Sequence, residues 1–579
     1  MSDQKNMFLA IALSLAILLG FQYLFPSPEV EQSAEQQTAE QGANNSAPTP
    51  SSGNAAIPNA GGTNVPTMSR AEVLTKTSRI KINTPSLHGS VSLTGGRIDD
   101  LTLIDYREEV DPTSPEIKLF SPSGSPHPYY AEFGWSMPAG ASTKLPNAET
   151  VWSTTASELT PDSPLVLTWD NGEGVIFTRK ISVDSKFLFT IEQSVQNNGS
   201  NDVTLFPYGL ISRTGIPETS GFFILHEGPI GVFNETLEEL DYDDLVDEGT
   251  KNVASTGGWI GITDKFWLAA LLPDQNKSFK GRFNHTAQGD RFQTDYIGSE
   301  GLVVKSGESA SVSNQLYAGA KEVDVLDEYE QKLGIDRLEL AIDWGWFYFL
   351  TKPIYFALEF INSQIGNLGL AILALTVVIK IILLPLAHKS YVSMTKMKKL
   401  QPEMMKLREK FGDDKQKLNQ EMMALYKREK ANPAAGCLPI LIQIPIFFAL
   451  YKVLFVTLLM RHQPFYGWIT DLSAPDPTTI FNLFGLIPWA PPEFLMIGAL
   501  PLLMGLSMYL QQKFNPQPAD PVQAKIFLLM PIFFTFLLAS FPAGLVIYWT
   551  WNNVLSIAQQ WFIMRRMGVS VSGQSTSTS

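Results

Sequence analysis

Two patterns of hydrophobic residues divide the chain: long uninterrupted apolar runs in the C-terminal half, and short alternating segments in the middle. An apolar run of about 20 residues can cross a bilayer as a helix, whereas alternation with a period of two is typical of half-buried strands. We therefore predict a membrane α-helical bundle joined to a large all-β domain. The runs predict transmembrane helices within residues 1–25 (an N-terminal anchor), 367–387, 436–460, 494–512, 526–541 and 544–564.

The alternating region, residues 69–334, predicts a large β-sandwich with a helix at its C-terminal end. Between residues 186 and 195, Phe187, Phe189 and Ile191 point to one side, and a turn follows at residues 197–199. Gly95 and Gly96 separate two further predicted strands in the same way. Strands and turns that recur over this length indicate a sandwich. Residues 321–333 then have helical spacing, with a glycine as the stop.

The remaining segments connect these elements, and their composition differs from one to the next. Residues 26–68 cannot bury enough apolar surface to fold, so they predict a disordered tether. Residues 335–366 are aromatic and amphipathic, which suits a helix lying in the membrane interface. Residues 388–435 predict a helical hairpin, and the other connectors are a loop at 461–493, a loop at 513–525 and a tail at 565–579.

The distribution of basic residues predicts the orientation in the membrane. In the hairpin, lysine and arginine outnumber acidic residues two to one, and cytoplasmic loops carry an excess of these residues. Lys513, Lys525, Arg565 and Arg566 fall on the same side after alternate crossings. We therefore expect both termini, the hairpin, the 513–525 loop and the tail in the cytoplasm. The β-domain and the 461–493 loop are then periplasmic, outside the inner membrane.

The amino-acid composition limits the classes of ligand and cofactor that the protein is expected to bind. Only 17% of the 579 residues are charged, against about a quarter in soluble proteins, which points to a membrane protein. The net charge of −14 argues against nucleic acid as a direct specific ligand. A single cysteine, Cys437, excludes an intrachain disulfide, and six scattered histidines without ligand spacing make a metal site or other cofactor unexpected.

Lys380 lies inside the apolar run at residues 368–386, where a charge costs roughly 3 kcal/mol. Such a residue usually faces a water-filled cavity or a partner. Thr376, one turn earlier, falls on the same helix face. Alternatively, Lys380 snorkels to the interface, because Leu386 is only about 9 Å further along the helix.

Further polar groups accompany this lysine inside the predicted spans, and they would form a hydrated substrate groove. The alternative is that they only hold the helices together by hydrogen bonds. No acidic residue lies on any span, which argues against a proton pump or a cation-coupled transporter. A lone cation would instead attract an anionic group that arrives transiently, such as an acidic flank of another membrane protein. The predicted groove residues are Lys380, Thr376, Gln443, Tyr548, Asn552 and Ser556.

The predicted hairpin is rich in methionine, whose flexible side chain suits the capture of varied apolar segments. Met394, Met405 and Met423 are the capture candidates. The alternative, that methionines join the two arms of the hairpin, is favoured for Met397, Met404 and Met422, which lie on the inner faces.

Several stretches carry a family resemblance. These are residues 399–460, which include LQPEMMKLREKFGDDKQKLNQEMMALYKREK, together with LLPLAHKSYVSMTKM before them and DPVQAKIFLLMPIFFTF and FPAGLVIYWTWNNVLSIAQQ after them. They resemble the YidC membrane-protein insertases of Gram-negative bacteria, part of the YidC/Oxa/Alb superfamily. The resemblance covers the C-terminal half, and the anchor, tether and β-domain fit the same architecture.

This resemblance implies five core helices around a groove that is open to cytoplasm and lipid and closed to the outside, with a periplasmic β-supersandwich. It implies a chaperone and insertase, not an enzyme, for nascent inner-membrane proteins. The implied partners are the Sec translocon, ribosome–nascent chain complexes and membrane lipids. Family members generally carry arginine where this chain has Lys380, so the charge is kept without bidentate hydrogen bonding. Where some relatives have paired tyrosines, this chain has Tyr548-Trp549.

Two other classes of function were weighed. A small-molecule transporter or channel would show an internal repeat with interrupted helices, and no such repeat is visible in the sequence. An enzyme seated in the β-domain would use His88, His127, His226 or His285 with nearby carboxylates, but these residues form no recognisable acid–base motif.

Overall fold

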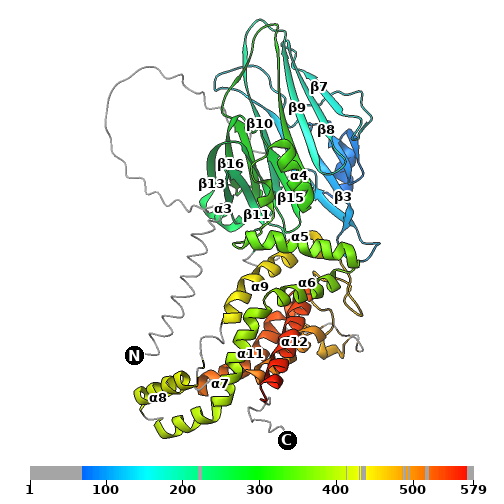
Figure 1. Ribbon diagram of the computed structural model, residues 1–579. Helices are drawn as coiled ribbons and strands as arrows, with labels where there is room; N and C mark the ends of the chain where they lie inside the picture. Colours follow the sequence, from blue (N-terminus) through cyan, green and yellow to red (C-terminus); the bar gives the residue numbers. More distant parts are fainter. Residues whose placement is uncertain are drawn as a thin grey trace, which may run out of the picture. The chain divides into compact units, whose positions relative to one another are not determined.

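The computed structural model describes residues 68–219, 225–411, 414–429, 431, 438–484, 487, 489, 491–492, 496–515 and 521–569. The predicted N-terminal anchor, almost all of the predicted tether and most of the tail lie outside these residues. The chain divides into two compact units between Asp343 and Trp344, a β-unit and a helical unit. Both are shown in Figure 1.

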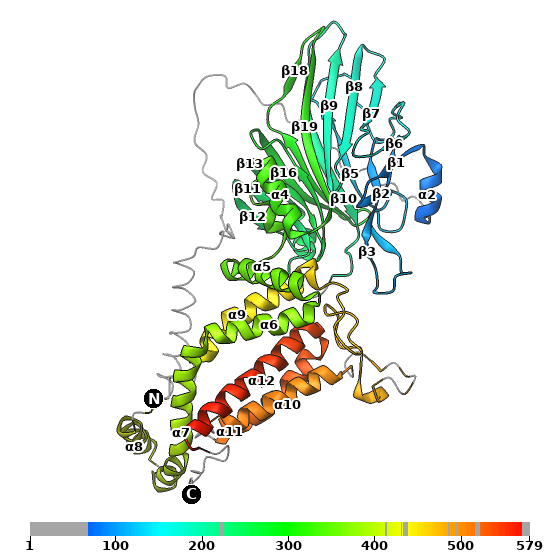
Figure 2. The same cartoon turned by 45° about the vertical axis from the view of Figure 1, so that its right-hand side comes forward.

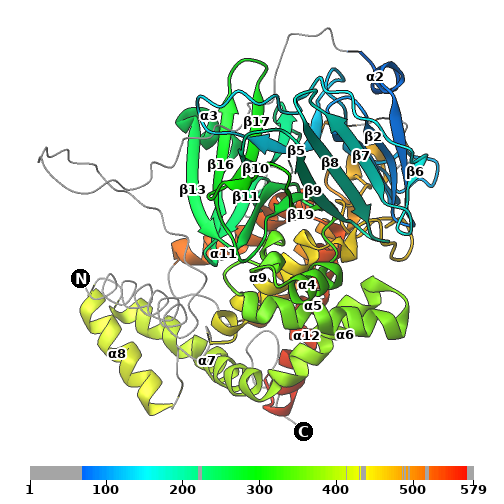
Figure 3. The ribbon, with the colours of Figure 1, turned by 90° about the horizontal axis from the view of Figure 1, so that it is seen from above.

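The β-unit is built from two mainly antiparallel sheets, which confirms the large β-sandwich (Figure 3). The described residues form an eleven-stranded and an eight-stranded sheet. The first runs β13 (Thr250–Thr256), β16 (Ser278–Thr286), β17 (Arg291–Gly298), β10 (Val203–Thr214), β5 (Tyr129–Ser136), β3 (Ile98–Arg107), β2 (Leu87–Ser92), β1 (Arg79–Asn83) and β6 (Glu158–Leu159), with β18 (Leu302–Val304) on β10 and β4 (Glu116–Phe120) on β3. The second runs β12 (Thr236–Glu239), β11 (Gly228–Phe233), β14 (Gly258–Thr263), β15 (Trp267–Leu272), β19 (Ser309–Ala320), β9 (Leu188–Asn197), β8 (Val175–Val183) and β7 (Leu165–Asp170).

The alternating pattern that predicted strands is also the pattern of burial. Along β9, Phe189, Ile191 and Val195 are fully buried, and Thr190, Glu192 and Ser194 on the other face are partly exposed. β8 pairs with β9 in an antiparallel hairpin from Val175 opposite Asn197 to Val183 opposite Phe189. At the β2–β3 turn Gly95 and Gly96 have φ of 77° and 64°, a conformation that favours glycine.

In the described part of the β-unit, three α-helices accompany the sheets, α2 (Arg70–Lys76), α3 (Tyr242–Glu248) and α4 (Val323–Leu333), with a 3₁₀ turn at Leu338–Ala341. α2 begins with a capping box, in which the Ser69 hydroxyl accepts from the backbone N–H of Glu72 and the Glu72 carboxylate accepts from the backbone N–H of Ser69. α4 confirms the predicted helix at this end of the unit. It ends at Gly334, which takes the left-handed conformation typical of a helix stop.

The helical unit begins with α5 and ends with α12 (Figure 2). α12 packs along α10, where Asn553 Nδ2 donates to Ser507 Oγ at 2.9 Å. It also contacts α6, α7 and α9. The described helices are α5 (Tyr348–Ile365), α6 (Leu368–Ile382), α7 (Leu384–Phe411), α8 (Lys415–Arg428), α9 (Leu438–Val456), α10 (Ala499–Phe514), α11 (Pro521–Leu537) and α12 (Ala543–Arg566), with short 3₁₀ turns at Leu458–Met460, Ile480–Asn482 and Leu538–Ser540.

The apolar run predicted as one span at 367–387 is two helices, α6 and α7, which meet at Leu383 with a bend of 71°. Pro385 in the first turn of α7 has no N–H to donate, and this favours a break in the helical hydrogen-bond ladder. Within the described residues this bent pair is the one candidate for crossing a bilayer by length and apolar composition, and no single helix meets that test.

Candidate functional site

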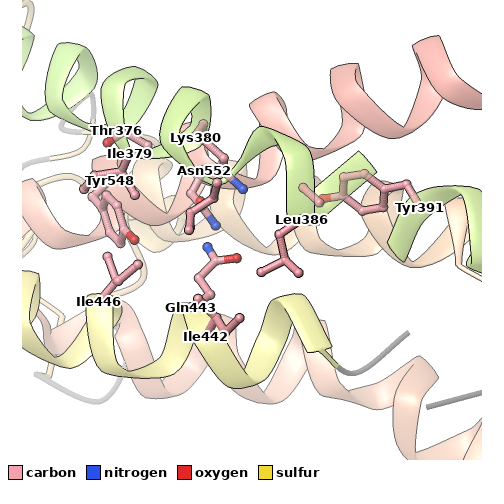
Figure 4. A pocket seen from close by; sticks show the side chains of 12 residues that line it. Thr376, Ile379, Lys380, Leu386, Tyr391, Ile442, Gln443, Ile446, Tyr548 and Asn552 are labelled. Atoms are coloured by element: carbon pink, nitrogen blue, oxygen red, sulfur yellow. The ribbon is translucent and has the colours of Figure 1, made fainter. Parts of the chain in front are cut away.

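A pocket in the helical unit brings together polar side chains from four helices, α6, α7, α9 and α12 (Figure 4). It measures about 500 Å³ when counted out to its open mouth. Apolar residues, among them Ile379, Leu386, Ile442 and Ile446, make up most of the rest of the wall. Five of the six predicted groove residues line it: Thr376, Lys380, Gln443, Tyr548 and Asn552.

Lys380 projects from α6 and is only partly exposed. Its Nζ donates to Ser556 Oγ on α12 at a distance of 2.7 Å. This is the one hydrogen bond or ion pair that Lys380 makes with the residues that the structure describes. Ser556, the sixth predicted residue, is 2% exposed and therefore lies behind the pocket wall as the partner of the ammonium.

The other predicted residues differ in what they offer to a ligand. Thr376 is buried, and its hydroxyl donates to Ile372 O at 2.7 Å, so the proton is used within its own helix. The amides of Gln443 and Asn552 point toward each other in Figure 4. Tyr548 makes a side-chain hydrogen bond with Gln443. The pocket therefore offers one cation and several neutral polar groups.

Tyr391, near the start of α7, also lines the pocket and was not predicted from the sequence. Figure 4 shows its hydroxyl directed toward Lys380. Tyr391 is 8% exposed, so its ring is part of the buried wall of the pocket. The spacing of eleven residues from Lys380 gave no usable signal, because the helix is broken at Leu383 between the two residues.

An aromatic cluster adjoins the pocket on α9 and α12. The Phe447 ring is stacked on Tyr548 with a centroid distance of 6.4 Å and meets Trp549 edge-on at 4.7 Å. Tyr451 and Phe455 continue the stack along α9. Trp549 therefore fills this region with aromatic surface and leaves Tyr548 as the hydroxyl-bearing member of the pair.

The segment before α10 packs over the N-terminal ends of two helices. Ala543 N and Gly544 N at the start of α12 donate to Ala474 O and Leu472 O at 2.8 Å and 3.0 Å. Asp476, which is 3% exposed, accepts from the backbone N–H of Leu500 in the first turn of α10 at 2.8 Å. Carboxylates stabilise helix N-termini, so Asp476 fixes this covering segment to the helices.

α7 and α8 form the predicted hairpin, and its arms are joined by an apolar cluster. Leu400, Leu425 and Ala431 are buried there, and Met397 and Met404 pack against them, which confirms the inner-face interpretation of these two methionines. The capture candidates lie elsewhere on the hairpin: Met405 and Met423 are 60% and 54% exposed, Met394 is half-buried, and none of the three lines the pocket.

The histidines of the β-unit do not share a carboxylate. His88 pairs with Glu116, His226 with Asp241 and His285 with Asp290. Among the described residues, no group of three histidine, cysteine, aspartate or glutamate side chains is placed to hold a metal ion.

Comparison with known proteins gives matches over both units. Residues 79–357 match the family model of the YidC periplasmic domain, and residues 360–570 match that of the 60Kd inner membrane protein. A membrane protein insertase YidC from Methylobacterium sp. (strain 4-46) is 52% identical over 98% of this chain and 96% of its own length. That from Methylobacterium nodulans (strain LMG 21967 / CNCM I-2342 / ORS 2060) is 51% identical with the same coverage.

A crystal structure of an active YidC insertase matches with a TM-score of 0.34 and 16% identity, over 83% of this chain and 91% of that one. The two family models together cover most of the chain, and the relatives are about half identical over nearly all of it. The chain therefore belongs to the YidC family of membrane protein insertases.

Proposed function

We propose that this protein moves hydrophobic segments of nascent inner-membrane proteins into the bilayer through the pocket beside Lys380 and assists their folding. Membership of the family makes it an inner-membrane protein with a periplasmic domain and a non-enzymatic role. The observation that carries the proposal is the Lys380 ammonium. It lies in a pocket among apolar helices and makes no ion pair with any described residue.

The proposed mechanism uses this charge to admit the polar flank of a substrate. A carboxylate in the flank would be attracted to the ammonium while the adjoining apolar segment moves between the helices into lipid. Transfer of a negative charge outward across a membrane that is negative inside gains about 2.3 kcal/mol per 100 mV. The membrane potential would therefore complete the transfer, and no covalent step is required.

The proposed topology has six spans, of which five enclose the groove, and both termini in the cytoplasm. Apolar composition supports the spans, and the bend between α6 and α7 supports a change of direction where the membrane part meets the hairpin. The hydrogen bonds from α12 to Leu472 and Ala474 support a groove that is closed on the periplasmic side. The domain boundaries given by the sequence are part of this proposal.

The hairpin is the proposed first contact with substrate, through Met394, Met405 and Met423. Its base is fixed to the bundle, because Lys398 Nζ donates to Lys513 O at 2.5 Å and Lys399 Nζ donates to Met567 O at 3.0 Å. An exposed methionine surface on a fixed base suits the capture of varied apolar segments. The proposed partners are ribosome–nascent chain complexes, the Sec translocon and membrane lipids.

Insertion into proteoliposomes tests the role of Lys380. The substrates are two single-span proteins that differ only by aspartate or asparagine in the translocated flank. Lys380→Ala and Lys380→Glu should insert the aspartate substrate about tenfold more slowly, the effect of 1.4 kcal/mol on a barrier. Lys525→Ala, which removes an exposed lysine of α11, is the control and should insert both substrates normally. Unchanged insertion of the aspartate substrate by Lys380→Glu would remove the electrostatic part of the mechanism.

Crosslinking tests the location of the path. Photoreactive groups placed beside Lys380, Gln443 and Tyr548 should crosslink to a stalled nascent membrane protein. Groups on the exposed face of the β-unit serve as the control. Crosslinks from the control positions alone would place the path elsewhere.

A further inference from the structure

Ser556 can only accept hydrogen bonds from groups in the pocket, because its own proton is used within α12. Its hydroxyl donates to Asn552 O, one turn earlier on α12, at 2.8 Å. A serine hydroxyl has one proton and two lone pairs, so this bond uses the proton and leaves only acceptor capacity. Lys380 Nζ donates to that oxygen at 2.7 Å. The serine is therefore matched to a cation and has no proton left for a substrate carboxylate.

The hydrogen bond to Ser556 fixes the position of the Lys380 side chain, which is otherwise flexible. A lysine ammonium sits on a flexible stem of four carbons and can occupy many positions. The bond joins α6 to α12 across 176 residues of sequence, and Ser556 is 2% exposed, so the acceptor itself is held in place by packing. Ser556 thus connects α6 and α12 at the position of the charge.

The contact also preserves the charge for a ligand. An ammonium has three N–H donors, and Ser556 accepts from one of them, which leaves two. Ser556 is neutral, so it orients the cation without cancelling its charge. An aspartate or glutamate at position 556 would hold the lysine more strongly but would take the place of the substrate carboxylate.

We propose that Ser556 is a positioning residue that fixes the Lys380 ammonium for a substrate carboxylate, so that the pocket favours segments with an acidic flank over segments with a neutral polar flank. This rests on the proposed function and names the substrate class of the same pocket. The quantity that defines it is a selectivity, the ratio of the insertion rates of two substrates that differ only by aspartate or asparagine in the flank. A serine that merely packs α12 would affect both substrates equally.

The test measures this ratio in proteoliposomes for the full-length protein and its variants. Ser556→Ala removes the acceptor and should lower the ratio about tenfold, the effect of one hydrogen bond to a charged group, through slower insertion of the aspartate substrate. Ser556→Thr keeps the hydroxyl and should restore the ratio. If Ser556→Ala does not accumulate in the membrane, Ser556→Cys replaces it, because a thiol of similar size is only a weak acceptor.

The chain offers a matched control in Ser507 on α10. Its hydroxyl also donates to a backbone oxygen of its own helix, Met504 O at 2.6 Å, and accepts from a neighbouring helix, but from the neutral amide of Asn553 at 2.9 Å. Ser507→Ala should therefore leave the ratio unchanged. The double variant Lys380→Ala/Ser556→Ala should have the ratio of Lys380→Ala alone, because the serine acts through the lysine.

The outcomes separate this inference from the function on which it rests. If Lys380→Ala lowers the ratio and Ser556→Ala does not, the positioning role is wrong and the proposed mechanism stands. Equal slowing of both substrates by Ser556→Ala would also overturn the positioning role. If neither variant changes the ratio, the electrostatic mechanism itself fails.

Discussion

Two lysines, one in each unit, both donate to a hydroxyl group but differ in the charges around them. Lys321 Nζ in the β-unit donates to Thr263 Oγ1 at 3.0 Å, and Lys380 Nζ in the helical unit donates to Ser556 Oγ at 2.7 Å. Around Lys321, four carboxylates contribute favourable electrostatic interactions: Asp264, Asp343, Glu227 and Glu239. No described carboxylate pairs with Lys380. The charge of Lys321 is thus partly compensated within the fold, and that of Lys380 is left for a ligand.

The rest of the β-unit follows the pattern of Lys321. Two of its partly buried arginines pair with carboxylates, Arg282 with Asp295 at 2.8 Å and Arg97 with Glu132 at 2.6 Å, and the buried Arg179 donates to the backbone oxygens of Gly96 and Phe133. A pair of this kind gains little net stability over apolar residues, but loss of one partner leaves an uncompensated charge and is costly. The β-unit therefore uses these charges in fixed structural contacts, with carboxylates or with backbone oxygens, whereas the helical unit keeps the charge of Lys380 available.

The largest expected effect comes from breaking one of these pairs. Asp295 is fully buried and accepts from Arg282 and from Gln293 Nε2. Asp295→Ala should lower the free energy of unfolding of the β-unit by about 3–5 kcal/mol, because it leaves a guanidinium without its carboxylate. Urea denaturation of the detergent-solubilised protein, followed by hydrogen exchange in β16 and β17, measures this loss.

An exposed cross-strand pair of the same unit supplies the control. Lys180 and Glu192 lie 3.5 Å apart on β8 and β9 with nearly half of each side chain exposed. Glu192→Ala should cost no more than about 1 kcal/mol. Equal losses in the two variants would mean that burial does not distinguish the pairs, and the contrast between the units would lose its basis.

The second-largest expected effect is a change in the stability of the β-unit at alkaline pH, caused by Lys321. Burial lowers the pKa of Lys321 to about 8, although the four carboxylates raise it. Between pH 8 and 10.5 the unfolded chain binds a proton that the folded chain has released, so stability rises with pH in this window. The gain is about 1.4 kcal/mol per pH unit, about 3 kcal/mol in all, and it is absent below pH 8, where both states are protonated.

Comparison with Lys321→Met isolates this lysine from tyrosines that titrate at higher pH. The stability of the unchanged protein, measured relative to the variant by urea denaturation, should rise across the window. A difference that stays constant from pH 7 to 10.5 would show that Lys321 titrates normally in the folded β-unit, as an exposed lysine does.

Sequence patterns predicted the structural features that depend on local periodicity within one element. The alternation at 186–195 predicted β9, and Gly95-Gly96 predicted the turn between β2 and β3. The polar positions of the C-terminal helices predicted five of the residues that line the pocket. Each of these features depends on spacing within one element, and spacing can be read directly from a sequence.

Features that depend on contacts between distant segments were not predicted. Alternation shows that Asp295 faces one side of β17 but not that β16 places Arg282 opposite it. Lys380 and Ser556 were both predicted as groove residues, but their bond joins helices 176 residues apart. Tyr391 was missed because the hairpin was treated as separate from the groove, although the bend at Leu383 leaves the first turns of α7 beside it.

The smallest expected effect tests whether Lys380 is a structural residue. Lys380→Met removes a cation that is not neutralised and keeps nearly the same shape, and Ser556 still donates to Asn552 O, so no donor is orphaned. We expect the helical unit to become more stable by about 1 kcal/mol, because a charge with no partner is costly among apolar helices. The measurement is the thermal unfolding midpoint in detergent, with hydrogen exchange in α6 and α12.

Lys398→Met should have the opposite sign, because Lys398 is also buried but donates to Lys513 O at the C-terminal end of α10. A cation at a helix C-terminus stabilises it by up to about 1 kcal/mol, so this variant should be slightly less stable than the unchanged protein. If Lys380→Met lowered the midpoint as much as Lys398→Met, Lys380 would hold the bundle together as Lys398 does. Lys380 and Lys398 would then share one structural role, and the contrast with Lys321 would no longer indicate a charge kept for substrate.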